Sequence, residues 1–166
     1  MTFIPANFFG TDVGAIYHVG YVVENLNDAM GQFSDAIGVR FMDHFVTARY
    51  RDAGNSIVTV ELHTSFSLQG PTHIELIEAM PGSIWDISSG PGLHHIGLWT
   101  DDVPAEAERL ARAGLPAVAS GVDSEDESGR GYFSYHRNPQ GSLVELVDIS
   151  KQQGMRDWIG ASGASA

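Results

Sequence analysis

The sequence predicts an α+β fold made of two βαβββ modules, and two observations support this prediction. First, each half of the chain has an alternating, β-forming stretch, then an amphipathic helical stretch, then further β-forming residues. Apolar residues at every second position are typical of a half-buried strand, and a spacing of three or four is typical of a helix. Second, the segment that starts at Ile16 recurs at a shift of 77 residues, with His95 on His18 and Gly97 on Gly20. A supersecondary unit that occurs twice explains this repeat.

In the first module, the stretch from Ile16 alternates and is rich in β-forming residues, which predicts a strand. Asn25 can cap the helix that follows, and Gly38 can end it. The apolar positions of this helix recur at helical spacing: Leu26, Met30, Phe33 and Ile37. Turns are predicted in "RYRDAGN" and "SLQGP", and they separate three further β-like runs. These runs lie near residues 39–48, 56–66 and 72–79.

The second module repeats this order. Asp102 takes the place of Asn25, Pro104 lies in the first helical turn, and Gly114 ends the helix. The closing stretch "SLVELVDIS" matches "HIELIEAM", which sets Glu145 on Glu75 at a shift of 70. We therefore expect residues 1–166 to form a single domain, whose tail adds one short helix that carries Trp158. Its parts are module one at about 15–80, a linker at 81–92, module two at about 93–150 and the tail at 151–166.

The composition narrows the class of protein. A chain of 166 residues with 43% hydrophobic and 18% charged residues fits one globular domain with a sizeable core. A net charge of −12 with a single lysine disfavours nucleic acid and anionic lipid, so we expect neither nucleic acid nor a membrane as a partner. Without cysteine, disulfides and thiolate metal sites are excluded. The apolar runs are too short for a bilayer span and the opening residues lack a secretory signal, so we expect a cytoplasmic protein.

Strand parity brings four polar residues to one surface. The first strand of each module has an apolar row that can pack on the helix, which leaves His18 and His95 on the opposite face. The same reasoning for "HIELIE" and "LVELVD" leaves Glu75 and Glu145 on that face, whereas His94 points the other way. Two imidazoles and two carboxylates are costly to bury together without a cation. We therefore predict a divalent transition metal, Zn, Ni, Co, Mn or Fe, bound by His18, Glu75, His95 and Glu145.

Other polar residues are candidates for the same cavity. The apolar row that starts at Val58 indicates that Glu61 and His63 point toward the cavity, where either could act as an acid or base or orient a ligand. We expect His44 to be structural. Trp85, in the linker, either closes over the cavity as a lid or anchors its loop.

Four motifs carry a resemblance to a known family. In this order, "YHVGYVVENL", "THIELIE", "LHHIGLWTDDV" and "NPQGSLVELVD" resemble the vicinal oxygen chelate superfamily over about residues 15–150. This superfamily includes glyoxalase I, extradiol dioxygenases and the antibiotic-binding bleomycin resistance proteins, and the motifs are most similar to methylmalonyl-CoA epimerase-like members. The resemblance implies that the two modules curl into a cup-shaped mixed sheet around a metal. Both modules lie in one chain, so a monomer can complete the site, although relatives often dimerise and a homodimer stays open.

The resemblance also implies a reaction class. The set His, Glu, His, Glu is similar to that of the isomerases, epimerases and lyases, which act on small organic substrates with adjacent oxygens through a metal-stabilised enolate or enediolate. Glu145 or Glu75 would then move the proton. An Fe(II)-dependent, ring-cleaving dioxygenase is the alternative enzyme, because Tyr135, Asn138 and Glu145 fit the spacing of the extradiol signature. A non-catalytic small-molecule or antibiotic-binding protein is the alternative outside the enzymes.

Overall fold

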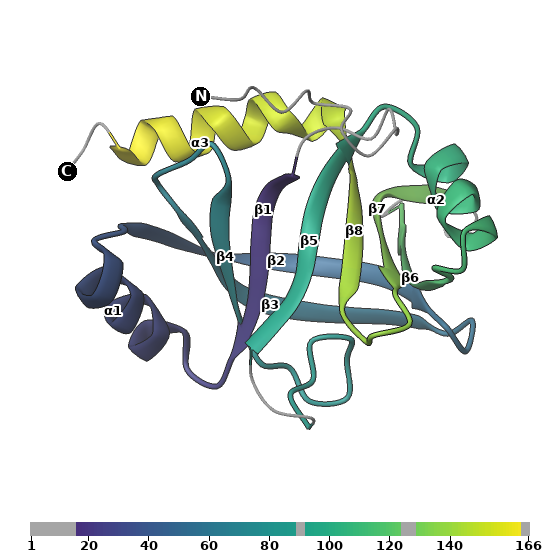
Figure 1. Cartoon of the computed structure of the whole chain (residues 1–166), viewed down its shortest axis with the longest axis horizontal. Coiled ribbons are helices and arrows are strands. Elements are labelled where there is room, and N and C mark those ends of the chain that lie inside the picture. The colour runs from purple at the N-terminus through teal and green to yellow at the C-terminus, as the bar shows by residue number, and fades with distance from the viewer. Residues whose placement is uncertain (1–15, 89–91, 124–128, 164–166) are drawn as a thin grey trace.

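The computed structural model describes residues 16–88, 92–123 and 129–163 (Figure 1). The opening segment, on which the expectation about a secretory signal depends, and residues 89–91 of the predicted linker lie outside these ranges. Among the described residues, no helix combines the length and the apolar character needed to cross a membrane.

The first module has the predicted order of elements. The Asn25 side chain accepts a hydrogen bond of 2.9 Å from the backbone N–H of Asp28, and so caps the helix. Gly38 ends this helix with φ at 72°, a left-handed conformation that favours glycine. The elements are β1 (Ile16–Val23), α1 (Leu26–Ile37), β2 (Phe41–Asp52), β3 (Ile57–Ser67) and β4 (His73–Glu78).

The second module repeats the order, and the tail adds a helix. Asp102 caps the second helix by accepting a hydrogen bond of 2.9 Å from the N–H of Ala105, as Asn25 does in the first module. The elements are β5 (Gly92–Thr100), α2 (Val103–Arg112), β6 (Ala117–Val122), β7 (Arg130–Arg137), β8 (Leu143–Asp148), the 3-10 turn η1 (Ile149–Lys151) and α3 (Gln152–Gly163).

The eight described strands form one mixed sheet that closes on itself in the order β1-β4-β3-β2-β6-β7-β8-β5. Each module contributes four neighbouring strands, with its first and last strands paired in parallel. The modules meet where β1 pairs with β5 and where β2 pairs with β6, both antiparallel. Helices α1 and α2 lie outside the sheet on opposite flanks, and α3 lies across one end of it (Figure 1). The curled α+β sheet predicted from the sequence is therefore confirmed.

Strand alternation separates an inner from an outer apolar layer. Leu76 of β4 and Leu146 of β8 face outward and pack on α1 and α2, respectively. Inside the closed sheet, a larger cluster combines residues from both modules, among them Tyr50, Leu62 and Trp99. One inner core is thus shared by the two modules.

One detail of the sequence prediction was wrong. Strand β2 continues through Asp52, although "RYRDAGN" was predicted as a turn, because residues 50–52 pair with β6 of the other module and Tyr50 is buried in the inner core. Ile37, one of the apolar positions that recur at helical spacing, is 61% exposed in the last turn of α1.

Candidate metal centre

The register of β1 and β5 makes room for two imidazole rings at the seam between the modules. His18 pairs with Gly97, and Gly20 pairs with His95. A Cβ atom at Gly20 would overlap the ring of His95, and one at Gly97 would overlap the ring of His18. The repeated His-x-Gly pattern therefore has a steric cause, since each glycine leaves the space that the other module's histidine occupies.

Four predicted ligands converge at this seam. The Nε2 atoms of His18 and His95 lie 2.6 Å apart. Oε2 of Glu75 lies 3.3 Å from Nε2 of His18 and 3.1 Å from Nε2 of His95. Oε2 of Glu145 lies 3.2 Å from the first and 3.5 Å from the second of these nitrogens. The structure therefore brings the two imidazoles and two carboxylates together, as strand parity predicts.

The convergent atoms are buried and incompletely satisfied. His18 and His95 are 1% and 0% exposed, and the side chains of Glu75 and Glu145 are 12% and 11% exposed. Within the described ranges, Oε2 of Glu75 is buried and has no hydrogen-bond partner apart from its contacts with the two imidazole nitrogens. Ligand atoms of His18, Glu75 and His95 all lie within 4.8 Å of one another, so these three residues could hold a metal ion.

The close spacing of two imidazoles and two carboxylates shifts the pKa of all four groups. Burial alone would lower the pKa of His18, but the carboxylates of Glu75 and Glu145 outweigh burial and raise it to about 9. The pKa of His95 is raised for the same reason. Burial opposes ionisation of Glu75 and Glu145, yet the two imidazoles hold the pKa of both carboxyls below its usual value. The site therefore attracts positive charge, and protons and a metal cation compete for it.

Two tyrosines border the centre. The Tyr17 and Tyr135 hydroxyls have pKa values raised well above 10, first by burial and then by the charges of Glu145 and Glu75. Tyr135 lies directly opposite Glu145 in the antiparallel pairing of β7 with β8. Both hydroxyls stay protonated at neutral pH and can donate hydrogen bonds, either to a carboxylate or to a bound substrate.

A cavity of about 380 Å³ opens onto Glu75 and Glu145. Its wall is largely aromatic, and α3 forms one side with Met155 and Trp158. The ring of His44 lies edge-on to Trp158 with centroids 4.3 Å apart, so His44 lines the cavity as well as supporting the structure.

The predicted orientation of Glu61 and His63 was wrong. Glu61 accepts a hydrogen bond from Thr47 on the outside of the sheet, and His63 contacts Asp43 there at 2.9 Å. The alternate row of β3, which includes Leu62, faces the inner core instead. On β3 the apolar row fills the interior of the closed sheet, so no helix is needed to cover it.

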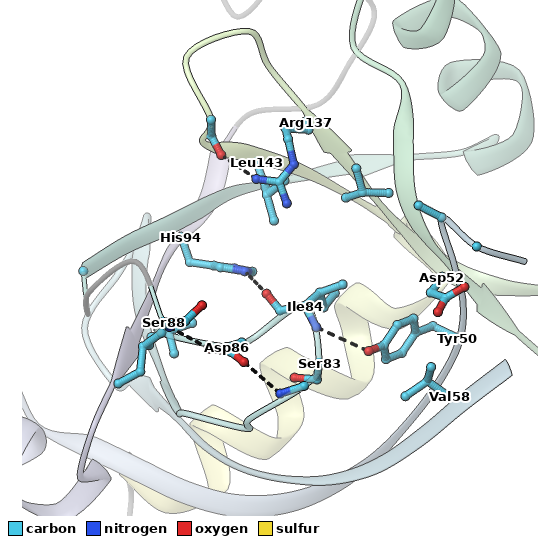
Figure 2. A pocket seen from close by; sticks show the side chains of 18 of the residues that line it. Tyr50, Asp52, Val58, Ser83, Ile84, Asp86, Ser88, His94, Arg137 and Leu143 are labelled. Atoms are coloured by element: carbon cyan, nitrogen blue, oxygen red, sulfur yellow. Dashed lines mark hydrogen bonds between the residues drawn. The ribbon is translucent and has the colours of Figure 1, made fainter. Parts of the chain in front are cut away.

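Trp85 is an anchor at the other end of the closed sheet. It is 2% exposed and packs edge-on against Tyr50 and Tyr135, with centroids 5.5 and 5.9 Å away. The turns around it line a second cavity of about 600 Å³, together with Tyr50 and His94 (Figure 2). Trp85 therefore does not cover the cavity at the metal centre.

Several cavity residues were missed by the sequence analysis. The largest group comes from the tail: Lys151, Met155 and Trp158. Helical periodicity can predict that a tail helix exists, but it gives no sign of where the helix docks. Tyr17 was missed because it lies at the strand's start, beside His18, where parity assigns it to the opposite face.

Comparisons with known proteins agree with this architecture. Residues 17–133 match the family described as the Glyoxalase/Bleomycin resistance protein/Dioxygenase superfamily. Methylmalonyl-CoA epimerase from Mycobacterium tuberculosis is 19% identical with a TM-score of 0.53, covering 82% of this chain and 88% of its own. A Streptomyces coelicolor methylmalonyl-CoA epimerase variant bound to 2-nitronate-propionyl-CoA is 20% identical with a TM-score of 0.56, covering 82% and 95%.

A larger enzyme contains a similar fold. A 4-hydroxymandelate synthase variant from Streptomyces coelicolor is 16% identical with a TM-score of 0.52, covering 80% of this chain and 38% of its own. No curated protein matches this chain. At these identities the solved structures support the fold alone.

Proposed function

Because the chain belongs to the glyoxalase/bleomycin resistance protein/dioxygenase superfamily, we propose that it is a metal-dependent isomerase, epimerase or lyase. Its substrate in this proposal is a small organic molecule with adjacent oxygens. The observation that carries the proposal is the convergence of two imidazole nitrogens and two carboxylates at the base of an aromatic cavity. The superfamily includes enzymes of this class, and the neighbours of known structure include epimerases.

In this proposal His18, Glu75, His95 and Glu145 hold the ion. The residues fit one, because the two Nε2 atoms face each other across the site and, among the described residues, buried Oε2 of Glu75 has only these imidazole nitrogens beside it. Two nitrogen and two oxygen donors suit Zn²⁺, Ni²⁺, Co²⁺, Mn²⁺ or Fe²⁺. When bound, such an ion supplies a Lewis acid that polarises a substrate oxygen and acidifies the neighbouring C–H bond.

The two glutamates have different neighbours, which favours Glu145 as the group that moves the proton. The Thr64 hydroxyl lies 3.3 Å from Oε1 of Glu75 and 2.9 Å from the carbonyl oxygen of Leu76, so its single hydrogen is shared between the carboxylate and the backbone, and Glu75 is held beside β3. Glu145 instead contacts Tyr135, a protonated phenol inside the cavity. A phenol that keeps its proton can orient the carboxylate by donating a hydrogen bond to it. We therefore assign proton transfer to Glu145 and positioning to Tyr135.

The cavity favours a compact, largely apolar substrate. Its volume of about 380 Å³ lies at the small end of the usual range for ligand pockets. Lys151 is the only lysine or arginine among the described residues that line it. The epimerases of similar fold act on CoA esters, which carry several phosphates and need more cationic contacts than one lysine gives. We propose a substrate without a CoA carrier, with an aromatic or polycyclic body and at most one negative charge.

A ring-cleaving dioxygenase is the second candidate, favoured by Tyr135 beside Glu145. Such enzymes use two histidines and one carboxylate. This alternative therefore requires one of the two glutamates to be dispensable for metal binding.

Metal content and proton exchange test the proposal. We expect plasma mass spectrometry of untagged protein to find about one transition metal ion per chain, lost in His95→Ala and Glu75→Ala. His63→Ala, on the outside of the sheet, is the matched control and should keep the metal. Exchange of a substrate α-proton with D₂O without O₂ supports the isomerase or lyase. Consumption of O₂ with Fe²⁺, and metal retained in Glu75→Ala, supports the dioxygenase. A wild-type protein that binds no metal after reconstitution contradicts both and favours a sequestering protein.

A further inference from the structure

The first histidine of the pair in β5, His94, has its own series of hydrogen bonds. Nε2 of His94 lies 2.8 Å from the carbonyl oxygen of Ile84. Nδ1 of His94 lies 2.9 Å from Nδ1 of His95. Figure 2 shows the His94 ring directed at Ile84, and Ile84 in turn linked to Tyr50.

The carbonyl oxygen of Ile84 determines which ring nitrogen carries the hydrogen in His94 and in His95. A carbonyl oxygen only accepts, so Nε2 of His94 must carry a hydrogen. A neutral imidazole has one donor and one acceptor nitrogen, so Nδ1 of a neutral His94 is the acceptor. Nδ1 of His95 must then be the donor, which leaves the lone pair of His95 on Nε2. That nitrogen is the one that faces His18 and the two glutamates.

The Ile84 carbonyl, which accepts the hydrogen bond from His94, is held in place by the packing around it. The backbone N–H of Ile84 donates to the Tyr50 hydroxyl at 3.3 Å, and Tyr50 is 1% exposed. The adjacent Trp85 is buried against Tyr50, which holds the turn in the core. The Ile84 carbonyl therefore has little freedom to turn away from His94.

The first module has no equivalent arrangement. The residue that matches His94 under the repeat is Tyr17, whose ring stacks on Trp99 with centroids 3.8 Å apart. Nδ1 of His18 is buried without a hydrogen-bond partner among the described residues. Only the second of the two candidate histidine ligands is thus oriented by another side chain.

We propose that His94 is a positioning residue that fixes the tautomer and ring orientation of His95, so that Nε2 of His95 is permanently available to the metal. This inference rests on the proposed metal site and adds to it a residue that does not touch the ion. It also links the ligand to the turn at residues 80–88, at the opposite end of the closed sheet from α3. Partners of this kind around metal-bound histidines typically change metal affinity by 10- to 100-fold when they are removed.

The test compares two substitutions and a control in the full chain, with Zn²⁺ as the probe and a chromophoric chelator as competitor. His94→Leu keeps the bulk and removes both hydrogen bonds, so we expect Zn²⁺ affinity to fall about 10- to 100-fold. His94→Gln can accept from His95 through its amide oxygen and donate to Ile84 through its amide nitrogen, so it should restore most of the affinity. His136→Leu is the control, since His136 is also fully buried but bonds Ser134 and the Leu115 carbonyl. It should lose stability and leave the affinity unchanged.

Nitrogen-15 NMR of the Zn²⁺-loaded wild-type protein reports which ring nitrogen of each histidine carries a hydrogen, and this measurement needs no substitution. We expect His94 with its hydrogen on Nε2 and His95 with its hydrogen on Nδ1, coupled across their hydrogen bond to Nδ1 of His94. Finding the hydrogen of His94 on Nδ1, or equal Zn²⁺ affinity in His94→Leu and wild type, overturns the inference and leaves the metal site intact. A wild-type protein that binds no Zn²⁺ overturns the proposed function itself, so the two failures are distinguishable.

Discussion

Raising the pH of the metal-free protein should destabilise it, because His18 binds its proton more tightly in the folded state than in the unfolded one. The carboxylates of Glu75 and Glu145 raise the pKa of His18 from 6.5 to about 9 despite its burial. A histidine whose folded pKa is raised stabilises the fold fully below its unfolded pKa of about 6.5, and this contribution disappears as the pH rises through the folded pKa.

The magnitude follows from the size of the shift. One pKa unit corresponds to about 1.4 kcal/mol, so His18 contributes about 3 kcal/mol of unfolding free energy that is lost between pH 6.5 and pH 9.5. For a domain of this size, this loss lowers the melting temperature by roughly 6–12 °C. The raised pKa of His95 changes stability in the same direction. His94 acts in the opposite direction and mostly below this window: burial and the neighbouring His95 lower its pKa to about 4, so it adds stability as the pH rises from about 4 to its unfolded pKa of about 6.5.

Chemical denaturation in urea at half-unit pH steps measures this effect after the protein is treated with a chelator. A pH of 9.5 or below avoids ionisation of Tyr17 and Tyr135 in the folded protein, because burial and the nearby carboxylates raise their pKa values well above 10. His18→Gln removes the main titrating group and should flatten the profile. With a metal ion bound, His18 carries no proton to lose, so the alkaline decline should also disappear. Equal stability of the metal-free wild-type protein at pH 6.5 and pH 9.5 would refute the reasoning that Glu75 and Glu145 raise the pKa of His18.

Three further outcomes follow from the geometry. Gly97→Ala places a methyl group where the imidazole ring of His18 lies, so we expect loss of metal content by mass spectrometry. Gly31→Ala is the control, because its new Cβ meets no neighbouring atom within 4 Å outside its own helix backbone. It should stabilise α1 by about 0.5–1 kcal/mol in urea denaturation. Glu145→Gln should lower the rate of substrate α-proton exchange by about 100-fold or more, and more than Glu75→Gln does after correction for metal content, if Glu145 moves the proton. Trp158→Ala enlarges the cavity, so KM for an aromatic substrate should rise about 10-fold with little change in kcat in steady-state assays.

Strand parity was enough to predict where His18, His95, Glu75 and Glu145 lie. Parity depends only on the local backbone, and Glu75 and Glu145 are each flanked by apolar residues of the clusters that pack on α1 and α2. The duplication added a second, independent copy of the same argument. For these residues the prediction did not require any knowledge of how distant strands meet.

Parity failed for Glu61 and His63 because it separates two faces without saying which is inside. On β1, β4, β5 and β8 the apolar row packs outward on a helix, so the polar residues face inward. On β3 the row that contains Leu62 fills the interior. That difference depends on which strands the helices cover, and a single strand's sequence does not contain this information. The docking of α3, which gives Trp158 to the cavity, was unpredictable for the same reason.

The duplicated modules explain why the site exists, but the duplication alone does not make it suited to one reaction. Two identical halves would give two equivalent histidines and two equivalent glutamates around a symmetric centre. The observed neighbours break this equivalence, since the Thr64 hydroxyl lies 3.3 Å from Oε1 of Glu75, whereas Glu145 lies opposite Tyr135 in the pairing of β7 with β8. His94 likewise has no counterpart at Tyr17. A directional proton transfer needs one carboxylate to be held and the other to respond to the substrate. We therefore expect the residues that differ between the two modules to determine which reaction the site carries out.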